Sequence, residues 1–518
     1  MGVKEAVGHV GNLLRKPVGI VNGAKNAVVN AINRQPVHTA GMTKALTSDN
    51  MNKHLKEMQY AVRGAVPIAA EAIQQELATG KHNRPYNEIL YCNIGNPHSV
   101  GQKPITWFRQ VLSLVNCPSM FDNPEVLKAF PKDVVERSLK ITSEIGGGTG
   151  AYSHSKGVLS FRNSIADFVK ARDGYACDPE NVYLIGGASA GIEKVLTAII
   201  SGPKDAVLIP IPQYPLYSAL ITMLGGQQVG YYLEEEKGWG FNIATTREVI
   251  KKARRDGLNP KAFCVINPGN PTGQLMSKQD LTDIVKLCRE ENLVLLSDEV
   301  YQENVYTETK KFVAMKKVVR DLGPEYDDFE LASFHSTSKG LVGECGRRGG
   351  FMELVGFAPD VEAEIFKHSC MGLCPNLDGQ VMTHLMVSPP LPGDESYELY
   401  TQETTGIYDA LKRKANMLQE ELNSIEGISC RPPEGAMYAF PQIQMPPKAL
   451  AAAKAQGKAP DMMYCLALLE ATGICCVPGS GFLQKEGTHH FRTTFLPPED
   501  KIKEALVRLK AFHLSFLA

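Results

Sequence analysis

The sequence predicts an α/β protein with a large domain and a smaller α+β domain. The large domain is expected to contain a mainly parallel sheet of seven strands flanked by helices. Short apolar runs rich in β-branched residues alternate with helical patterns through the middle of the chain, as a parallel sheet requires. After Pro389 and Pro390 the pattern changes to long helices and short strands. The chain has 518 residues, enough for two or so domains.

Composition describes an ordinary globular chain, with 43% hydrophobic and 21% charged residues and a formal net charge of −1. This balance argues against nucleic acid or an anionic membrane as the main partner. No apolar run approaches the ~20 residues of a membrane-spanning helix. The 12 cysteines lack the paired spacing of metal ligands, so we expect reduced thiols and no metal site.

Residues 1–45 are expected to form a basic N-terminal extension. Glu5 is the one acid before Asp49, and the apolar residues from Val3 to Leu14 recur at helical spacing. Two hypotheses fit this composition: an organelle transit peptide, or an arm that lies on a dimer partner. We therefore expect a mitochondrial or cytoplasmic location, and the basic, acid-poor start favours the mitochondrial one.

Residues 46–115 are expected to form the N-terminal part of the smaller domain and a loop at the active site. The pattern from Asn52 to Thr79 predicts a helix, which Pro67 can cap or break. The segment from Tyr91 to Arg109 is rich in Gly, Pro and Asn, and we expect a loop there until Ile105 begins a helix.

Residues 116–388 are expected to form the large domain. Helical patterns such as Ile192–Ile200 and Lys278–Glu290 lie in most gaps between its strands. Ligands of such sheets gather at the carboxyl ends of the strands, so the polar residues that follow each strand are candidates for a site. The predicted strands are Val182–Ile185, Ala206–Ile209, Val229–Tyr232, Phe263–Ile266, Val294–Ser297, Leu331–His335 and Phe351–Gly356.

Residues 389–518 are expected to form the C-terminal part of the smaller domain. Helix signals run from Tyr397 to Ile425, and a second helix is expected from Asp500 onward. The segment Lys448–Lys458 is rich in alanine and lysine, and we expect it on the surface.

Lys339 lies where the strand Leu331–His335 ends, and it is followed by glycines interleaved with Arg347 and Arg348. A lysine in such a buried position loses its proton more readily than a surface lysine, which suits Schiff-base chemistry with a carbonyl. The neighbouring hydroxyls and arginines suit a phosphate. Together these residues predict a site for pyridoxal phosphate.

Further candidates follow other strands. Small residues at Gly186–Gly191 open a helix and leave backbone N–H groups free for a phosphate. Tyr214 could stack on a flat ring, and the amide of Asn270 stands in a dense turn. Asp298 would be costly to bury unless a protonated pyridine nitrogen pairs with it, and Tyr301 could reach the same ring. Each feature alone also suits an ordinary turn or core packing.

Arg492 lies inside the apolar stretch Phe491 to Leu496, where an arginine usually pairs with a carboxylate of the protein or of a substrate. The order of all these features resembles the fold type I pyridoxal-phosphate enzymes, and more narrowly the alanine aminotransferases. The resemblance covers roughly residue 45 to the C-terminus. It rests on YAVRG (Tyr60–Gly64), GQKPITWFRQV (Gly101–Val111), LIPIPQYPLYSA (Leu208–Ala219), CVINPGNPTGQ (Cys264–Gln274), DEVYQENVY (Asp298–Tyr306), SFHSTSKG with GECG, and VPGSGF (Val477–Phe482).

The resemblance implies roles for the ring-side residues. Lys339 would form the Schiff base and move the proton during the reaction. Asp298 would pair with the pyridinium nitrogen, Asn270 and Tyr301 would hold the phenolic oxygen, and Tyr214 would stack on the ring.

The resemblance also implies how the phosphate and the substrate are held. Tyr152 would reach the phosphate of a partner subunit, which implies a homodimer, and Arg492 would bind the α-carboxylate of the substrate. Arg347 stands where relatives usually have an aromatic residue, so two arginines compete for the phosphate, and the Gly-x-Arg-Gly pattern favours the second. The implied phosphate ligands are Ala188, Ser189, Ser336 and Arg348.

The implied activity is a reversible ping-pong transfer of an amino group between L-alanine or pyruvate and L-glutamate or 2-oxoglutarate, with pyridoxal 5′-phosphate as cofactor. The alternative in the same branch is a glutamate:glyoxylate aminotransferase, against which the ending Ser515–Ala518 argues because it is not a peroxisomal address. A lyase on the same fold and a non-catalytic ligand sensor are further alternatives. No motif marks the residue for a side-chain carboxylate, for which Arg63 and Arg109 are candidates.

Overall fold

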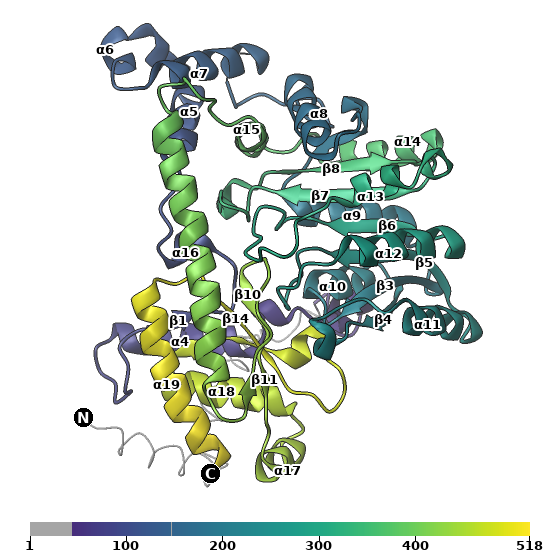
Figure 1. Cartoon of the computed structure of the whole chain (residues 1–518), viewed down its shortest axis with the longest axis vertical. Coiled ribbons are helices and arrows are strands. Elements are labelled where there is room, and N and C mark those ends of the chain that lie inside the picture. Colours follow the sequence, from purple (N-terminus) through teal and green to yellow (C-terminus); the bar gives the residue numbers. More distant parts are fainter. Residues whose placement is uncertain (1–43, 147) are drawn as a thin grey trace.

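The computed structural model describes residues 44–146 and 148–518. The hypotheses about the basic extension therefore concern residues that lie almost entirely outside the described part. In Figure 1 the large sheet and its helices lie on the right, while the long helix α16 (Tyr397–Asn423) runs along the left toward the C-terminal elements. Among the described helices, none is long and apolar enough to cross a membrane.

The large sheet has seven strands in the order β2-β8-β7-β6-β5-β3-β4. Strand β8 runs antiparallel to both of its neighbours, and the other pairs are parallel, so the predicted mainly parallel sheet is confirmed. Each predicted strand is present, with ends shifted by a few residues at most. The strands are β2 (Val182–Leu184), β3 (Asp205–Ile211), β4 (Gln227–Tyr232), β5 (Asn259–Ile266), β6 (Val294–Asp298), β7 (Leu331–Ser336) and β8 (Gly350–Val355).

Helices cover both faces of this sheet because successive strand residues point to opposite sides. In β5, Phe263 and Val265 pack with α11, α12 and α13, whereas Ala262 and Cys264 pack with α9, α10 and α14. The bounds are α9 (Ala188–Ile199), α10 (Pro215–Met223), α11 (Ile243–Arg255), α12 (Lys278–Glu291), α13 (Met315–Asp321) and α14 (Pro359–Cys370).

A third apolar cluster joins the upper helices of Figure 1 to the β2–β8 edge of the sheet. It includes Phe108, Phe161 and Met382, all fully or almost fully buried. Helix α5 begins one residue after the predicted start at Ile105. The helices of this region are α5 (Thr106–Asn116), α6 (Pro124–Leu127), α7 (Lys132–Glu144), α8 (Leu159–Asp173) and α15 (Leu377–Val387).

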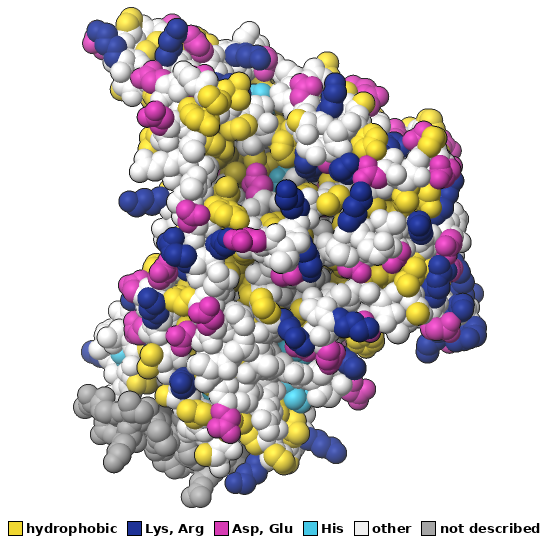
Figure 2. Space-filling view, viewed as in Figure 1, with side chains coloured by type: hydrophobic (Ala, Val, Ile, Leu, Met, Phe, Trp, Pro, Cys, Tyr) yellow, Lys and Arg dark blue, Asp and Glu magenta, His cyan; other side chains and the backbone are white. Residues whose placement is uncertain are grey.

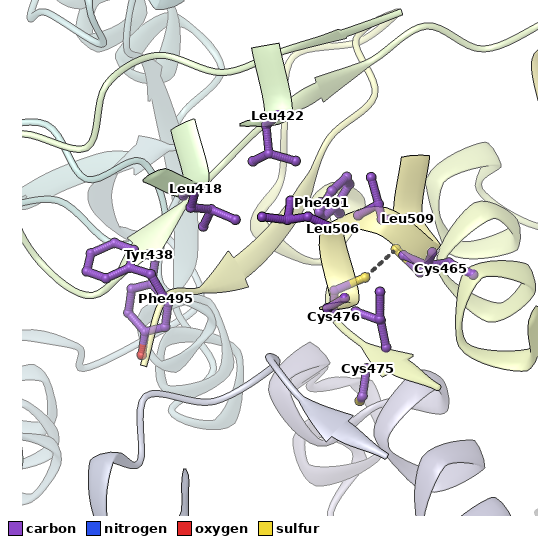
Figure 3. Packing of buried hydrophobic residues seen from close by; sticks show 14 of the residues in the cluster. Leu418, Leu422, Tyr438, Cys465, Cys475, Cys476, Phe491, Phe495, Leu506 and Leu509 are labelled. Carbon is purple, nitrogen blue, oxygen red and sulfur yellow. Dashed lines mark hydrogen bonds between the residues drawn. The ribbon is translucent and has the colours of Figure 1, made fainter. Parts of the chain in front are cut away.

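The C-terminal elements share a core with the segment that precedes α5. Figure 3 shows Leu418 and Leu422 of α16 in one cluster with Phe491 and with Leu506 and Leu509 of α19. Strand β1 pairs with β12 and ties the early segment to this part of the chain. The elements are α4 (Ala65–Ala78), β1 (Leu90–Tyr91), β9 (Ile428–Ser429), β10 (Tyr438–Ala439), β11 (Gln442–Ile443), α17 (Pro447–Ala455), α18 (Pro460–Thr472), β12 (Ile474–Cys475), β13 (Val477–Pro478), β14 (Phe491–Thr494) and α19 (Glu499–Leu517).

One expectation about helices needs correction. The helix predicted from Asn52 to Thr79 is interrupted, because α3 (Lys53–Glu57) ends at the extended Met58 and α4 begins only after Gly64. The interruption brings Tyr60 to the hydroxyl of Tyr214, 3.1 Å away. The segment at 448–458 lies on the surface, as expected. It is largely the helix α17, whose alanines 449 and 453 are buried while its other residues are exposed or half-buried.

Charged side chains of both signs are interspersed over the face in Figure 2, with Lys and Arg gathered at the edge formed by α11. These cations are largely paired: Arg247 contacts Glu290, and Arg254 contacts Glu291. The gathering is therefore a solvated helix face with its own counter-charges.

Candidate active site

A cavity of about 950 Å³ opens at the carboxyl ends of the strands of the large sheet. All but one of the predicted site residues line it. Tyr152 does not, and its side chain is 78% exposed. The predicted residues that meet at the cavity are Ala188, Ser189, Tyr214, Asn270, Asp298, Tyr301, Ser336, Lys339, Arg348 and Arg492.

Lys339 and Asp298 come to the cavity from the neighbouring parallel strands β7 and β6. The amine of Lys339 donates to the carbonyl oxygen of Gly95 at 2.5 Å. Asp298 is the last residue of β6, and burial raises the pKa of its carboxyl to about 6, although the nearby amine of Lys339 acts in the opposite direction. Among the described residues, this carboxyl receives only long hydrogen bonds, from the Tyr217 hydroxyl at 3.3 Å and from the Val300 amide at 3.4 Å. It is therefore a buried acid suited to a cationic partner.

The turn before α9 and Arg348 form one wall of the cavity. Arg348 donates through Nη2 to the carbonyl oxygen of Gly186 at 2.8 Å. A Cβ atom on Gly187, whose φ is +89°, would lie 2.4 Å from that nitrogen, so the close approach needs glycine. Arg347 instead pairs with Asp378 at 3.2 Å. Of the two adjacent arginines, the second thus lies against the N-terminus of α9, where a phosphate is favoured.

Arg492 is a buried cation with neutral partners. It lies on β14 and is 1% exposed. Its Nη1 donates to Asn270 Oδ1 at 3.0 Å, its Nη2 donates to the carbonyl oxygen of Asn93, and its guanidinium lies 4.1 Å from the ring centre of Tyr438. Among the described residues, no carboxylate lies within ion-pair distance of Arg492 and its Nε has no hydrogen-bond partner.

Several cavity residues were not singled out from the sequence. Tyr60 and Tyr438 line the cavity, and so do Gly95 and Cys345. Burial by itself raises the pKa of Tyr438, but the charges of Lys339 and Arg492 outweigh this effect and lower it below its ordinary value. Tyr60 belongs to the YAVRG segment quoted above, whereas Tyr438 comes from the two-residue strand β10, which carries no motif.

No metal site accompanies this cavity in residues 44–146 and 148–518, where no group of three or more His, Cys, Asp or Glu side chains could hold an ion. The side chains that line the cavity include an amine, a buried carboxyl, phenols and arginines.

Comparison with known proteins identifies the family. The family model described as aminotransferase class I and II matches residues 118–509. The chain belongs to this family. It is therefore an aminotransferase, and its architecture is fold type I, as the sequence predicted.

Relatives of this aminotransferase support the narrower resemblance. The chain is 53% identical over 479 residues to a probable mitochondrial alanine aminotransferase of Dictyostelium discoideum, covering 92% of this chain and 90% of that protein. It is 46% identical over 476 residues to glutamate–glyoxylate aminotransferase 2 of Arabidopsis thaliana, covering 92% and 97%. A solved alanine aminotransferase of Pyrococcus furiosus superimposes with a TM-score of 0.70 at 25% identity, covering 89% and 99%.

The two candidate arginines for a second carboxylate differ in this aminotransferase. Both line the cavity. Arg109 makes two hydrogen bonds to the buried carboxylate of Glu344, at 2.7 and 3.0 Å. Arg63 has an exposed side chain and forms no ion pair with any described residue. The structure therefore leaves Arg63, rather than Arg109, free to meet an added carboxylate.

Proposed function

We propose that this aminotransferase moves an amino group reversibly between L-alanine and 2-oxoglutarate, giving pyruvate and L-glutamate, with pyridoxal 5′-phosphate as cofactor. The observation that carries the proposal is Arg492, a buried guanidinium whose protein partners are uncharged. A buried cation of this kind is stabilised by a carboxylate, and every substrate named here carries an α-carboxylate. The names of the relatives favour alanine among the amino acids.

The cavity residues fit pyridoxal phosphate. Asp298 is a buried acid that a protonated pyridine nitrogen would keep ionised. Arg348, Ser336 and the first N–H groups of α9, at Ala188 and Ser189, would hold the phosphate. When bound, the cofactor would supply an aldehyde for the amino group and a ring that accepts electrons from the α-carbon.

The chain's own residues would position the substrate and move its proton. Lys339, whose amine acts electrostatically on Asp298, would carry the proton at the substrate α-carbon. The Asn270 oxygen already accepts from Arg492, which leaves its NH₂ group to donate to the ring oxygen beside Tyr301. Tyr214, held by Tyr60, would pack on the ring.

Substrate selection would combine two arginines. Arg492 would hold the α-carboxylate that alanine and glutamate share. Arg63 would meet the side-chain carboxylate of glutamate, while the methyl group of alanine leaves Arg63 in solvent. This division explains how one cavity accepts both substrates in turn.

A homodimer and a mitochondrial location complete the proposal. The exposed side chain of Tyr152 lies outside its own cavity, which supports the proposed contact with the phosphate site of a partner subunit. Mitochondrial relatives from Dictyostelium discoideum and Arabidopsis thaliana favour mitochondria over the cytoplasm.

A glutamate:glyoxylate aminotransferase is the second candidate, because relatives of that name share 46% identity with the chain. Half-reactions separate the two activities. Alanine and glutamate should each convert the cofactor-loaded protein to its amino form without an acceptor, and pyruvate and 2-oxoglutarate should reverse the conversion. A strong preference for glyoxylate over pyruvate would favour the second candidate. A protein that cannot be loaded with the cofactor would overturn both, and Lys339→Ala is the control.

A further inference from the structure

Tyr438 reaches the active-site cavity from the smaller domain. It lies on β10, opposite Thr494 of β14, the strand that also carries Arg492. Its ring belongs to the apolar cluster of Figure 3, and the residue is 3% exposed, yet its side chain lines the cavity. There it lies beside two groups of the proposed reaction, Arg492 and Lys339.

The ring of Tyr438 supports the guanidinium of Arg492. The guanidinium lies 4.1 Å from the ring centre of Tyr438 and 4.9 Å from that of Phe482. An aromatic face attracts a cation electrostatically and occupies none of its N–H groups. Because the oxygens of Asn270 and Asn93 that accept from Arg492 are neutral too, the cation is held in place without a bound negative charge that would compete with a carboxylate.

The hydroxyl of Tyr438 lies close to the amine of Lys339. A Cβ atom on Gly95 would lie 2.2 Å from this hydroxyl and 3.0 Å from the amine, so both groups lie over the Cα of Gly95. The amine donates to the carbonyl oxygen of the same glycine at 2.5 Å. Burial raises the pKa of the phenol, but the nearby charges of Lys339 and Arg492 outweigh burial and lower it.

The hydroxyl of Tyr438 has capacity for a further partner. The hydroxyl of Tyr301 lies 3.5 Å away, at the limit of a hydrogen bond, with the two rings 84° apart. A phenolic oxygen has two lone pairs, so this long contact leaves it able to accept. A neutral amine has two N–H groups and an ammonium has three. Lys339 therefore gains a donor when it takes up a proton, and Tyr438 is placed to accept from it.

We propose that Tyr438 is a positioning residue for the amino transfer: its ring holds the guanidinium of Arg492, and its hydroxyl accepts a hydrogen bond from Lys339 when that lysine takes the proton of the substrate α-carbon. The inference rests on the roles proposed above for Lys339 and Arg492. In this step the C–H bond breaks, its electron pair is left with the α-carbon, and the proton forms a new N–H bond on Lys339. The hydroxyl stabilises the ammonium that forms more than the amine before it, so it accelerates the transfer.

Two substitutions separate the hydroxyl from the ring. Tyr438→Phe keeps the aromatic face and removes the hydroxyl, whereas Tyr438→Leu removes both. We would follow single-turnover half-reactions of the cofactor-loaded variants with alanine and with glutamate, which give the rate at saturation and the dissociation constant separately. Tyr438→Phe should react about tenfold or more slowly at saturation, with dissociation constants within about threefold of the wild type. Tyr438→Leu should be equally slow and should also bind both amino acids about tenfold more weakly.

Tyr306→Phe is the matched control. Tyr306 is 4% exposed and donates to the carbonyl oxygen of Ala436 at 2.7 Å, but it does not line the cavity. The loss of its hydroxyl should therefore change neither the rate nor the dissociation constants. The proposal is overturned if Tyr438→Phe, still folded by circular dichroism, reacts at the wild-type rate, or if it loses as much affinity as Tyr438→Leu.

The same experiment separates a failure of this inference from a failure of the proposed function. A wild-type protein that reacts with glutamate but not with alanine would contradict the proposed alanine specificity. The comparison of the Tyr438 variants would then be made with glutamate, because glutamate brings the same α-carboxylate to Arg492 and the same α-proton to Lys339.

Discussion

Replacing Arg492 by lysine tests the proposed recognition of the substrate. The side chain is buried, lies on β14, and donates to Asn270 and Asn93. Lysine keeps the positive charge but has one flexible ammonium group in place of the rigid fork of the guanidinium. The substitution therefore keeps the positive charge but removes the paired hydrogen bonds that a guanidinium can donate to a carboxylate.

The size of the effect follows from the hydrogen bonds at stake. A guanidinium that binds a carboxylate in bidentate fashion makes two charge-assisted hydrogen bonds, each contributing about 1.5–3 kcal/mol. Lysine keeps roughly one of them, so the expected loss is about 1.5–3 kcal/mol, or roughly ten- to hundredfold in kcat/KM. Because alanine and glutamate share the α-carboxylate, both should lose the same factor.

The assay is the half-reaction of the cofactor-loaded variant with each amino acid, followed by the absorbance of the cofactor. Cofactor affinity is measured in parallel, because Asn270 loses a hydrogen bond from Arg492 in the variant. Losses for alanine and glutamate that differ more than about threefold would refute a role at the shared carboxylate, and so would a variant as active as the wild type.

Three further predictions address other residues. Arg63→Met should lower kcat/KM for glutamate and 2-oxoglutarate by about tenfold or more, because an exposed charge-assisted contact is lost. The kinetics with alanine should stay within about twofold of the wild type. Equal losses for glutamate and alanine would argue against Arg63 as the ligand of the side-chain carboxylate. Folding raises the pKa of Asp298 from 3.8 to about 6, so the folded cofactor-free protein binds more protons than the unfolded chain in that window and loses stability as pH rises through it. Relative to Asp298→Asn, the urea-unfolding free energy of the wild type should fall by about 1.4 kcal/mol between about pH 5 and about pH 8, and a pH-independent difference would contradict the burial of this carboxyl. Gly95→Ala would place a Cβ 2.2 Å from the hydroxyl of Tyr438, whereas a Cβ at Gly346, which also lines the cavity, would meet nothing within 4 Å. Gly95→Ala should therefore lower kcat by roughly tenfold to hundredfold, and Gly346→Ala should leave kcat unchanged. Equal kinetics in the two variants would contradict this prediction.

The sequence was sufficient for the sheet and for the residues at its strand ends. Most strands of the sheet are buried and have apolar runs that could be located in the sequence, and ligands of such sheets gather at the carboxyl ends of the parallel strands. That is why the sequence predicts Lys339 and Asp298 at the same edge of the sheet.

Other features depended on contacts between distant segments. The order of strands in the sheet is one, because local pattern does not specify which strands pair. The sequence pattern favoured Arg348 over Arg347 for the phosphate, but the partners of the two side chains, Gly186 for Arg348 and Asp378 for Arg347, are visible only in the structure. Arg109 and Arg63 were equivalent until the structure paired the first with Glu344.

The sequence by itself determined the alternation of strands and helices and the resemblance to the family, because both depend on short segments of the chain. Only the tertiary structure decided which charges are already paired, that the predicted early helix breaks to bring Tyr60 to the cavity, and that Tyr438 lies against Arg492. These features arise from side chains far apart in the chain, and pairing and burial are properties of the packed molecule that no local segment carries.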